Sequence, residues 1–268
     1  QVHIVANQIG LESDLEDLPN DHPLALAVRG VAGQLGIDRF PALRLQITST
    51  IPVAAGLGSG AAVSVAIARA LSAFLGNPLK NDQVSQIAYR VDQKYHGTPS
   101  GIDNTVIAYA QPVFFIRGQP FSRLCASQPF TIVIGNTGSA SPTGAVVGDV
   151  RERWQTDPPA YERLFDEIGA IALAARTAIE KGLVEALGPL MTRNQALLQH
   201  LTVSSPELDR LVETALAAGA GGAKLSGGGR GGNMIALASP ANAAEIAKAL
   251  RGAGAVNTII TTVGRDTT

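Results

Sequence analysis

The sequence predicts an α+β protein of two domains, and three observations support that class. A chain of 268 residues with 46% apolar content can bury two modest cores, and the usual domain size favours two. The first half carries a strand that leads into a glycine-rich turn and then a helix. A new β-branched strand opens near residue 129, followed by helices and further strands. We therefore expect an N-terminal domain over residues 1–127 and a C-terminal domain over residues 128–268.

Composition narrows the classes of function. The formal net charge is -1, which gives no electrostatic reason to expect nucleic acid or an anionic membrane as a partner. No apolar run reaches spanning length and no charged-then-apolar leader is visible at Gln1, so we expect a soluble protein. Cys125 is the single cysteine, which argues against disulfides and cysteine metal sites and fits a reducing cytoplasm. We expect Cys125 to be buried as a small apolar residue.

The N-terminal half begins inside a strand. Residues 1–6 alternate in polarity, with no initiator methionine and no turn before them, so we expect the chain to be a shortened piece of a longer protein. An acidic loop is predicted over residues 12–21. A helix is predicted over residues 22–35, with proline in its first turn and glycine after its end. Residues 43–47 alternate apolar and polar side chains, the period of a half-buried strand.

A glycine-rich stretch after that strand is the first candidate site. It runs Ile51-Pro-Val-Ala-Ala-Gly-Leu-Gly-Ser-Gly-Ala-Ala-Val63, and the helix predicted to follow it ends before Gly76. Gly56, Gly58 and Gly60 carry no Cβ, so their N–H groups can approach a ligand closely. The positive end of the following helix dipole points at the same place. The ligand this favours is an anion, most simply phosphate.

Three interpretations of the glycine-rich stretch compete. A Walker A site is excluded because the Gly-Lys-Ser/Thr ending is lacking and no lysine precedes Lys80. Gly56, Gly58 and Ala61 fit the loose dinucleotide-binding fingerprint, with Asp82 about twenty residues further on, but that fingerprint alone is weak. The stretch can also be a helix entry packed tightly against a strand. Other parts of the sequence must decide.

The second candidate site is Lys94-Tyr-His-Gly-Thr-Pro-Ser-Gly-Ile-Asp-Asn-Thr105. Its many turn formers favour a fixed, non-helical path. A rigid loop that carries His96, Ser100 and Asp103 is a suitable platform for catalysis. The alternative is structural: Asp103 caps the next element, and His96 satisfies a buried carbonyl.

Apolar periodicity predicts the other elements. A helix and then two strands flank the second site, over residues 81–93, 106–110 and 112–115. The strands of the C-terminal half are predicted over residues 129–135, 234–238 and 256–263. The helices of that half are predicted over residues 143–154, 160–181, 183–200, 206–218 and 240–251. Trp154 and Phe165 are expected in the core.

The third informative stretch is Gly219-Ala-Gly-Gly-Ala-Lys-Leu-Ser-Gly-Gly-Gly-Arg-Gly-Gly-Asn-Met234. So many glycines are typical of a flexible linker, but a strand and a helix continue directly from this one. Glycine between ordered elements suggests a close backbone approach, either to a ligand or to another segment.

Together the three stretches resemble motifs of the GHMP small-molecule kinase family. Ala55-Gly-Leu-Gly-Ser-Gly-Ala-Ala62 is similar to the family's phosphate loop, and Lys224-Leu-Ser-Gly-Gly-Gly-Arg-Gly-Gly232 to its C-terminal glycine motif. His96-Gly-Thr-Pro-Ser-Gly-Ile-Asp-Asn104 is similar to the signature of the mevalonate kinases within the family. The three motifs occur in the family's order and spacing. The resemblance implies an N-terminal domain like the second domain of ribosomal protein S5 and a ferredoxin-like C-terminal domain, with ATP and substrate in the cleft between them.

The activity implied by the resemblance is ATP-dependent phosphorylation of mevalonate at its C5 hydroxyl, which gives 5-phosphomevalonate and ADP and uses Mg²⁺. Asp103 is the implied base for the hydroxyl, and Ser59 and Asp92 are the implied Mg²⁺ ligands. The implied ATP-phosphate contacts are Pro52, Ala55, Gly56, Leu57, Gly58, Ser59, Gly60 and Ala61. The implied substrate contacts are His96, Gly97, Thr98, Ser100, Thr137, Gly228 and Gly229. A homodimer is left open.

The chain departs from the family pattern in several places. The family usually has two serines after Gly-Leu-Gly, and the second binds Mg²⁺, whereas this chain has Ser59 and then Gly60. Either Ser59 or water then takes that ligand position. Asp92 stands where a glutamate is common, and Asn136 where many relatives have aspartate. The family's first motif, which bears a catalytic lysine, is absent, and we expect it in a missing N-terminal segment.

Rival functions stay open. The nearest is another member of the family, such as a phosphomevalonate kinase, a mevalonate 3-kinase or a diphosphomevalonate decarboxylase, although the segment from Thr98 to Asp103 favours mevalonate itself. A rival from another class is a non-catalytic nucleotide-binding protein of the same fold. A dinucleotide oxidoreductase is more distant, because nothing after Asp82 supplies a parallel-sheet repeat.

Overall fold

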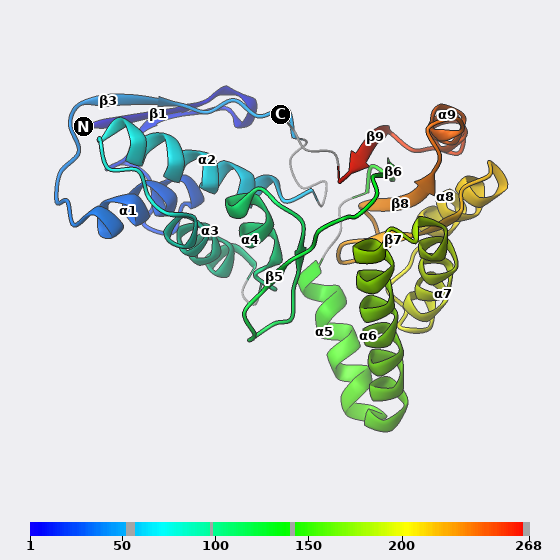
Figure 1. Cartoon of the computed structure of the whole chain (residues 1–268). Coiled ribbons are helices and arrows are strands. Elements are labelled where there is room, and N and C mark those ends of the chain that lie inside the picture. The colour runs from blue at the N-terminus through cyan, green and yellow to red at the C-terminus, as the bar shows by residue number, and fades with distance from the viewer. Residues whose placement is uncertain (52–56, 97–98, 140–142, 265–268) are drawn as a thin grey trace. The chain divides into compact units, whose positions relative to one another are not determined.

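The structure is a computed structural model that describes residues 1–51, 57–96, 99–139 and 143–264 (Figure 1). It divides into two compact units. The described residues up to Ser122 form the first unit, and those from Arg123 onward form the second. The domain boundary expected after residue 127 stays a prediction.

A three-stranded sheet with the order β2-β1-β3 forms one layer of the first unit. Strand β1 (Val2–Ala6) pairs antiparallel with β2 (Leu11–Asp14) and parallel with β3 (Leu43–Gln46). The short 3₁₀ helix η1 (Asn7–Ile9) connects β1 to β2. The two strands predicted at the start of the chain and near residue 45 are therefore confirmed.

The acidic segment after residue 11 is not a loop throughout, because its first residues lie in β2. His3 on β1 explains the difference. Its Nδ1 lies 2.8 Å from Oδ1 of Asp14, and its Nε2 lies 3.2 Å from Oε1 of Glu12. A histidine between two carboxylates favours this antiparallel pairing. The acidic composition of the segment, taken alone, did not reveal that cross-strand partner.

Four helices complete the first unit, and β1 and β3 run side by side over α1 and α2 (Figure 1). They are α1 (Pro23–Leu35), α2 (Ser59–Phe74), α3 (Asn81–His96) and α4 (Ile102–Tyr109). A small two-stranded sheet pairs β4 (Val113–Phe114) with β5 (Ser122–Arg123). The first-unit core buries apolar side chains of β1, α1, α2 and α3 against one another. This packing fixes where α2 and α3 present their ends.

The strand predicted over residues 106–110 is wrong, because these residues belong to α4 and to its end. Gly101 caps the helix with φ 89°, a left-handed conformation that glycine adopts without strain. The Thr105 hydroxyl donates to the Gly101 carbonyl over 2.7 Å, so a β-branched residue serves a helix here. The non-helical path expected for the whole second stretch is therefore wrong at both ends, because residues 94–96 belong to α3 and residues 102–105 to α4. The strand over residues 112–115 is confirmed in β4.

The second unit contains a four-stranded sheet with the order β7-β8-β6-β9, in which all neighbours are antiparallel. Its strands are β6 (Phe130–Asn136), β7 (Gly222–Ser226), β8 (Asn233–Ala238) and β9 (Asn257–Val263). Numbered along the chain within this unit, the spatial order is 2-3-1-4. With helices between the first and second strands and between the third and fourth, this is the ferredoxin-like arrangement that the resemblance implies.

Strand β7 was not predicted, because its residues sit inside the third glycine-rich stretch. Glycine is needed there for packing. A Cβ added at Gly222 would lie 2.1 Å from the Gly188 carbonyl oxygen, so the two backbones meet directly. The close approach expected from the glycines is thus, at this position, an approach to another segment of the chain.

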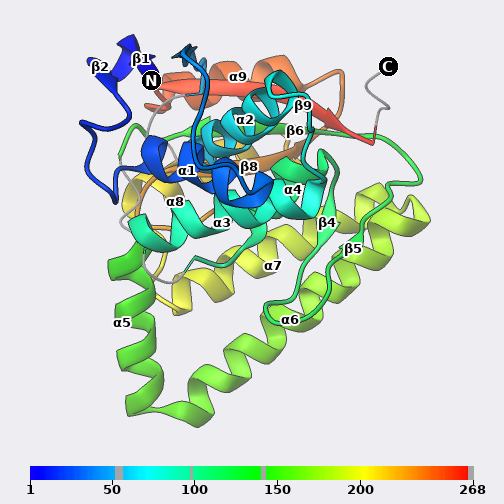
Figure 2. The same cartoon turned by 90° about the vertical axis from the view of Figure 1, so that its left-hand side faces the viewer.

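Helices cover both faces of this sheet. The helices described in this unit are α5 (Thr143–Thr156), α6 (Pro158–Lys181), α7 (Leu187–His200), α8 (Pro206–Ala217) and α9 (Ala243–Gly252), of which α5 packs mainly on α6 rather than on the sheet. The predicted helices are confirmed, except that the one predicted from residue 183 starts as a 3₁₀ turn, η2 (Val184–Ala186). Helices α8 and α9 bury the main core against one face. Helices α6 and α7, which run side by side in Figures 1 and 2, lie against the other face.

Three expected core residues are exposed instead. Trp154 is 37% exposed, Phe165 is 39% exposed, and Cys125 is also exposed. Trp154 lies on α5, where Val146 is the buried residue among those described. Phe165 packs edge-on against Tyr161 of its own helix, with ring centroids 6.3 Å apart. The apolar stripes of α5 and α6 are wider than the surfaces that cover them, which sequence periodicity cannot show.

Of the helices in the described part of the chain, none has both the length and the apolar character that crossing a bilayer requires.

Candidate active site

The first element of the site is the start of α2. Gly58 is the N-cap residue, with φ 68° and ψ 27°, and its carbonyl accepts a hydrogen bond from the Ala62 N–H over 2.9 Å. No side chain within the described residues caps this end of the helix. The first-turn N–H groups and the dipole of a 16-residue helix thus form a site suited to an anion. The helix starts at Ser59, so Ser59 and Gly60 lie in its first turn.

Asp103 lies beside this helix start. A Cβ added at Gly58 would be 3.6 Å from Cγ of Asp103 and 3.3 Å from Cδ1 of Ile107. Both neighbours come from α4, and the Asp103 side chain is exposed. A carboxylate that solvent can reach therefore stands next to the N-terminal end of α2, where a base for a substrate hydroxyl could act on a group bound at that end.

Asp92 provides a second carboxylate at the same helix end. It lies on α3 and is half-buried, and its Oδ1 is 3.9 Å from where a Cβ at Gly60 would stand. Helices α3 and α4 thus bring one carboxylate each to the first turn of α2. Carboxylate and hydroxyl oxygens are the donors that Mg²⁺ prefers, and the hydroxyl of Ser59 belongs to the same turn.

The rest of the second motif is only partly described. The Ser100 hydroxyl accepts a hydrogen bond from the Ile102 N–H over 3.3 Å, which stabilises the turn into α4. Gly97 and Thr98 lie outside the described residues, and so does the side chain of His96. Their expected contacts with substrate stay predictions. Among the expected phosphate contacts, Pro52, Ala55 and Gly56 also lie outside the described residues.

In the second unit, Thr137 and the C-terminal glycine motif come together. The Thr137 N–H and hydroxyl both donate to the Gly232 carbonyl, over 2.9 and 3.0 Å. The Gly232 N–H in turn donates to the Ser139 carbonyl over 2.9 Å. The end of β6 and the loop between β7 and β8 are therefore held as one surface.

The loop between β7 and β8 is also pinned from its other side. A Cβ at Gly229 would lie 2.0 Å from the Val203 carbonyl oxygen, so only glycine fits there. Arg230 has φ 54°, a left-handed conformation, and it forms an ion pair with Asp149. Its Nε donates to the Thr202 carbonyl over 3.0 Å. Sequence reasoning missed the pairing of Arg230, since Asp149 is remote in sequence and carries no motif.

Sequence reasoning also gave no role to the half-buried lysine at the start of the third motif. Lys224 lies on β7, and burial in apolar surroundings lowers its pKa to about 8. In the sequence, Lys224 stands between the apolar residues Ala223 and Leu225. Because side chains alternate along a strand, this indicates that Lys224 lies on the face opposite to that of its two neighbours.

Comparison with known proteins agrees with this arrangement. Family profiles described as "GHMP kinases N terminal domain" and "GHMP kinases C terminal" match residues 24–111 and 175–256. A mevalonate kinase of Pyrococcus furiosus is 38% identical, covering 84% of this chain and 67% of the relative. A mevalonate kinase of Pyrococcus horikoshii is 37% identical, covering 91% of this chain and 72% of the relative.

The fold is matched as well. The crystal structure of L. major mevalonate kinase in complex with R-mevalonate has a TM-score of 0.80 to this chain and 31% identity, covering 100% of this chain and 82% of the other. The chain belongs to the GHMP kinase family. The relatives and the matched fold accordingly make this chain a kinase of that family.

Proposed function

We propose that this protein transfers the γ-phosphoryl group of ATP to the C5 hydroxyl of mevalonate, giving 5-phosphomevalonate and ADP. The observation that carries the proposal is the carboxyl group of Asp103 beside Gly58 at the start of α2. The proposal is supported by relatives 37–39% identical that bear the name mevalonate kinase.

The helix start acts on the phosphates. N–H groups of the first turn of α2, with Gly58 at the cap, donate to phosphate oxygens, and the helix dipole offsets their negative charge. Because Gly58 and Gly60 have no side chains, the phosphates can approach the backbone closely. Such a fixed set of donors stabilises the charge that spreads over the transferring group.

Asp103 acts on the substrate. Its carboxylate orients the C5 hydroxyl and accepts its proton while the hydroxyl oxygen bonds to the γ-phosphorus. The bond from that phosphorus to the β–γ bridging oxygen breaks, and ADP leaves with the electron pair. Gly101, as the cap of α4, holds the Asp103 backbone in the first turn of a helix, so the carboxylate is presented from a rigid element.

Ser59 and Asp92 fit a Mg²⁺ ion that also contacts ATP. Within the described residues no cluster of three or more histidine, cysteine, aspartate or glutamate side chains can hold a metal. Mg²⁺ is commonly bound through one or two carboxylates plus substrate phosphates. When bound, the ion neutralises phosphate charge. Asp92 and Ser59 would hold it at the first turn of α2.

Thr137, Gly228 and Gly229 are also proposed to contact substrate. Support comes from the hydrogen bonds of Thr137 to Gly232, which tie the end of β6 to the glycine loop. His96, Gly97, Thr98 and Ser100 are proposed to contact mevalonate from the first unit. A homodimer and a cytoplasmic location stay predictions.

A coupled ADP-release assay tests the proposal. The protein is given ATP and Mg²⁺ with mevalonate, phosphomevalonate or diphosphomevalonate, and the product is located by ³¹P NMR. We expect turnover with mevalonate and a phosphate monoester on C5. Turnover with another substrate of the series assigns a different reaction. Calorimetric ATP binding without any turnover would make the protein a nucleotide-binding module instead.

A further inference from the structure

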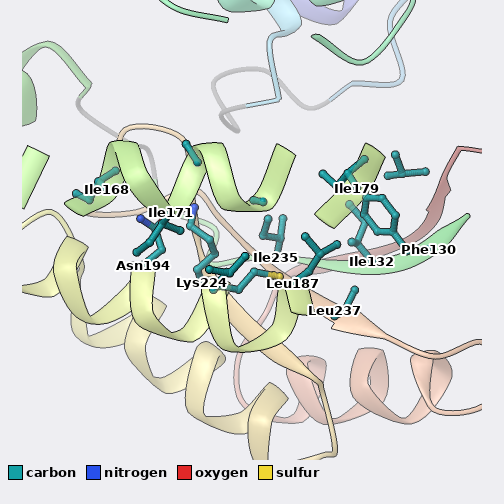
Figure 3. Close-up of a pocket in the computed structure, with 15 residues that line it drawn as sticks. Phe130, Ile132, Ile168, Ile171, Ile179, Leu187, Asn194, Lys224, Ile235 and Leu237 are labelled. Atoms are coloured by element: carbon teal, nitrogen blue, oxygen red, sulfur yellow. The ribbon is translucent and has the colours of Figure 1, made fainter. Parts of the chain in front are cut away.

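A cavity of about 420 Å³ lies within the second unit, between its sheet and helices α6 and α7 (Figure 3). Phe130 and Ile132 of β6 and Ile235 of β8 form its sheet side. Ile171 of α6 and Leu187 of α7 form part of its helical side. The cavity shares no residue with those proposed to bind ATP or mevalonate. Its volume is within the usual range for small-molecule sites, about 300–1,000 Å³.

One charged side chain faces this apolar space. Along β7 the neighbours Ala223 and Leu225 are 0% and 2% exposed and point into the core under α8 and α9. Lys224 between them points to the other face and lines the cavity. Lys224 is the one titratable side chain among the described residues that line it.

The polar groups of the cavity gather at one end. Figure 3 shows Lys224 and Asn194 together near Ile168 and Ile171, with Phe130 and Ile179 toward the opposite end. Asn194 is only 8% exposed. The lining of the cavity is therefore almost wholly apolar, and its two polar side chains lie toward one end.

The ammonium group of Lys224 is short of acceptors. Its Nζ donates to the Leu225 carbonyl over 2.7 Å, and this is its single recorded partner among the described residues. An ammonium can donate three hydrogen bonds. No carboxylate is among the described residues that line the cavity. A half-buried cation without an anionic partner is unfavourable, and desolvation accordingly lowers the pKa of Lys224.

We propose that this cavity binds a medium-chain monocarboxylate, with the carboxylate on Lys224 and Asn194 and the alkyl chain along the apolar walls. One ammonium and one amide neutralise and satisfy a single carboxylate. A phosphate or diphosphate head would bring more charge than the site can offset. A neutral amphiphile would leave the ammonium without its partner.

The proposal is tested by calorimetric titration of the full chain with decanoate, kept below its micelle concentration. Decanol and decyltrimethylammonium serve as neutral and cationic probes of equal chain length. The variant Lys224→Met keeps most of the side-chain volume without the charge. The matched control Lys248→Met removes an exposed lysine of α9 in the same unit. A third variant, Ala175→Phe, fills the cavity from α6. Thermal melts show that each variant is folded.

We expect decanoate to bind the wild type and the Lys248→Met variant equally, and Lys224→Met at least tenfold more weakly. The affinity for decanol should change little in Lys224→Met. The variant Ala175→Phe should abolish binding of both decanoate and decanol. Shortening the acid from ten to eight carbons should weaken binding about fourfold per methylene. The proposal is overturned if decanoate does not bind, if Lys224→Met binds it unchanged, if the cationic probe binds as well, or if ATP displaces it.

Discussion

Gly58 lies directly against the carboxyl group of Asp103, since a Cβ at residue 58 would be in van der Waals contact, 3.6 Å, with that group's carbon. The contact joins the cap of α2 to the first turn of α4. The phosphate-binding element and the proposed base are therefore positioned by the same two helices. A substitution at residue 58 should therefore affect catalysis as well as stability. A glycine with a similar backbone conformation but remote from Asp103 can serve as the control for stability.

Gly58→Ala should impair catalysis beyond its effect on stability. Gly58 has φ 68°, so alanine pays roughly 1–2 kcal/mol for the left-handed conformation. Its methyl group would also press on Cδ1 of Ile107, 3.3 Å away, and would touch the Asp103 side chain that this contact helps to position. Gly76 is the matched control, with φ 75° and no atom within 4 Å of an added Cβ. Both variants should melt at lower temperature, but only Gly58→Ala should lower kcat/KM by tenfold or more. Equal loss of activity in both would show that residue 58 matters only for folding.

Asp103→Asn should reduce kcat by orders of magnitude with little change in ATP affinity, because a base acts mostly in the transition state. The amide nearly preserves the volume of the side chain but cannot accept the proton. Asp82→Asn, an exposed first-turn carboxylate of α3, is the control and should leave kcat unchanged. Steady-state kinetics and calorimetric ATP titration measure the two quantities. A collapse of ATP binding in Asp103→Asn would mean that Asp103 is structural.

Gly60→Ser should lower the Mg²⁺ concentration needed for half-maximal activity. The new Cβ would lie 3.9 Å from Oδ1 of Asp92, the nearest atom outside α2 among the described residues, so the hydroxyl fits beside that carboxylate. It would supply the oxygen that the family usually has at this position. Gly60→Ala adds the same Cβ without the hydroxyl and should leave the Mg²⁺ dependence as in the wild type. A similar shift in both variants, or none in either, would argue against Mg²⁺ binding at this turn.

The helices and strands could largely be predicted because their apolar periodicity is local. Errors arose where a remote partner decides the outcome. Strand β2 depends on His3 across the hairpin, and β7 on the contact between Gly222 and Gly188. Periodicity also cannot say which apolar faces find a partner, which is why Trp154 is exposed.

The residues of the candidate site were likewise predictable where a local motif marks them and not where they depend on a remote partner. Motif order pointed to Asp103 and to the glycine loops, because glycine-rich turns beside a helix start have a recognisable spacing. Sequence alone could not show that Asp92 and Asp103 come from different helices to the first turn of α2. Nor could it show the Thr137 contact with Gly232, which joins residues 95 positions apart.

The hairpin of β1 and β2 should show a pH-dependent stability. Hydrogen bonding to Asp14, and then to Glu12, raises the pKa of His3, and hydrogen bonding to His3 lowers the pKa of Asp14. The histidine contribution is present below its unfolded pKa of about 6.5 and is lost as pH rises through the raised value. The aspartate contribution is present above about pH 3.9 and is lost as pH falls through the lowered value.

His3→Gln should therefore lower the melting temperature most between about pH 4 and 6.5, and the difference should shrink on either side. The effect should be small and weakened by salt, because these groups are exposed. Thermal melts across pH at low ionic strength measure it, with His200→Gln as the control. A difference independent of pH would show that packing, not charge, is responsible.

Lys224→Met should stabilise the protein at neutral pH. Burial lowers the lysine pKa from 10.5 to about 8, so the unfolded chain binds more protons between these values. At pH 7 the charged lysine therefore lowers the free energy of unfolding of the wild type by on the order of 3 kcal/mol. As the pH rises from about 8 to 10.5, this cost disappears and the wild type becomes more stable. Methionine carries no such penalty, so its advantage should shrink over the same range. Denaturant unfolding at pH 7 and pH 10 measures both free energies. A constant advantage, or a loss of stability at pH 7, would mean that the lysine has an anionic partner in the folded protein.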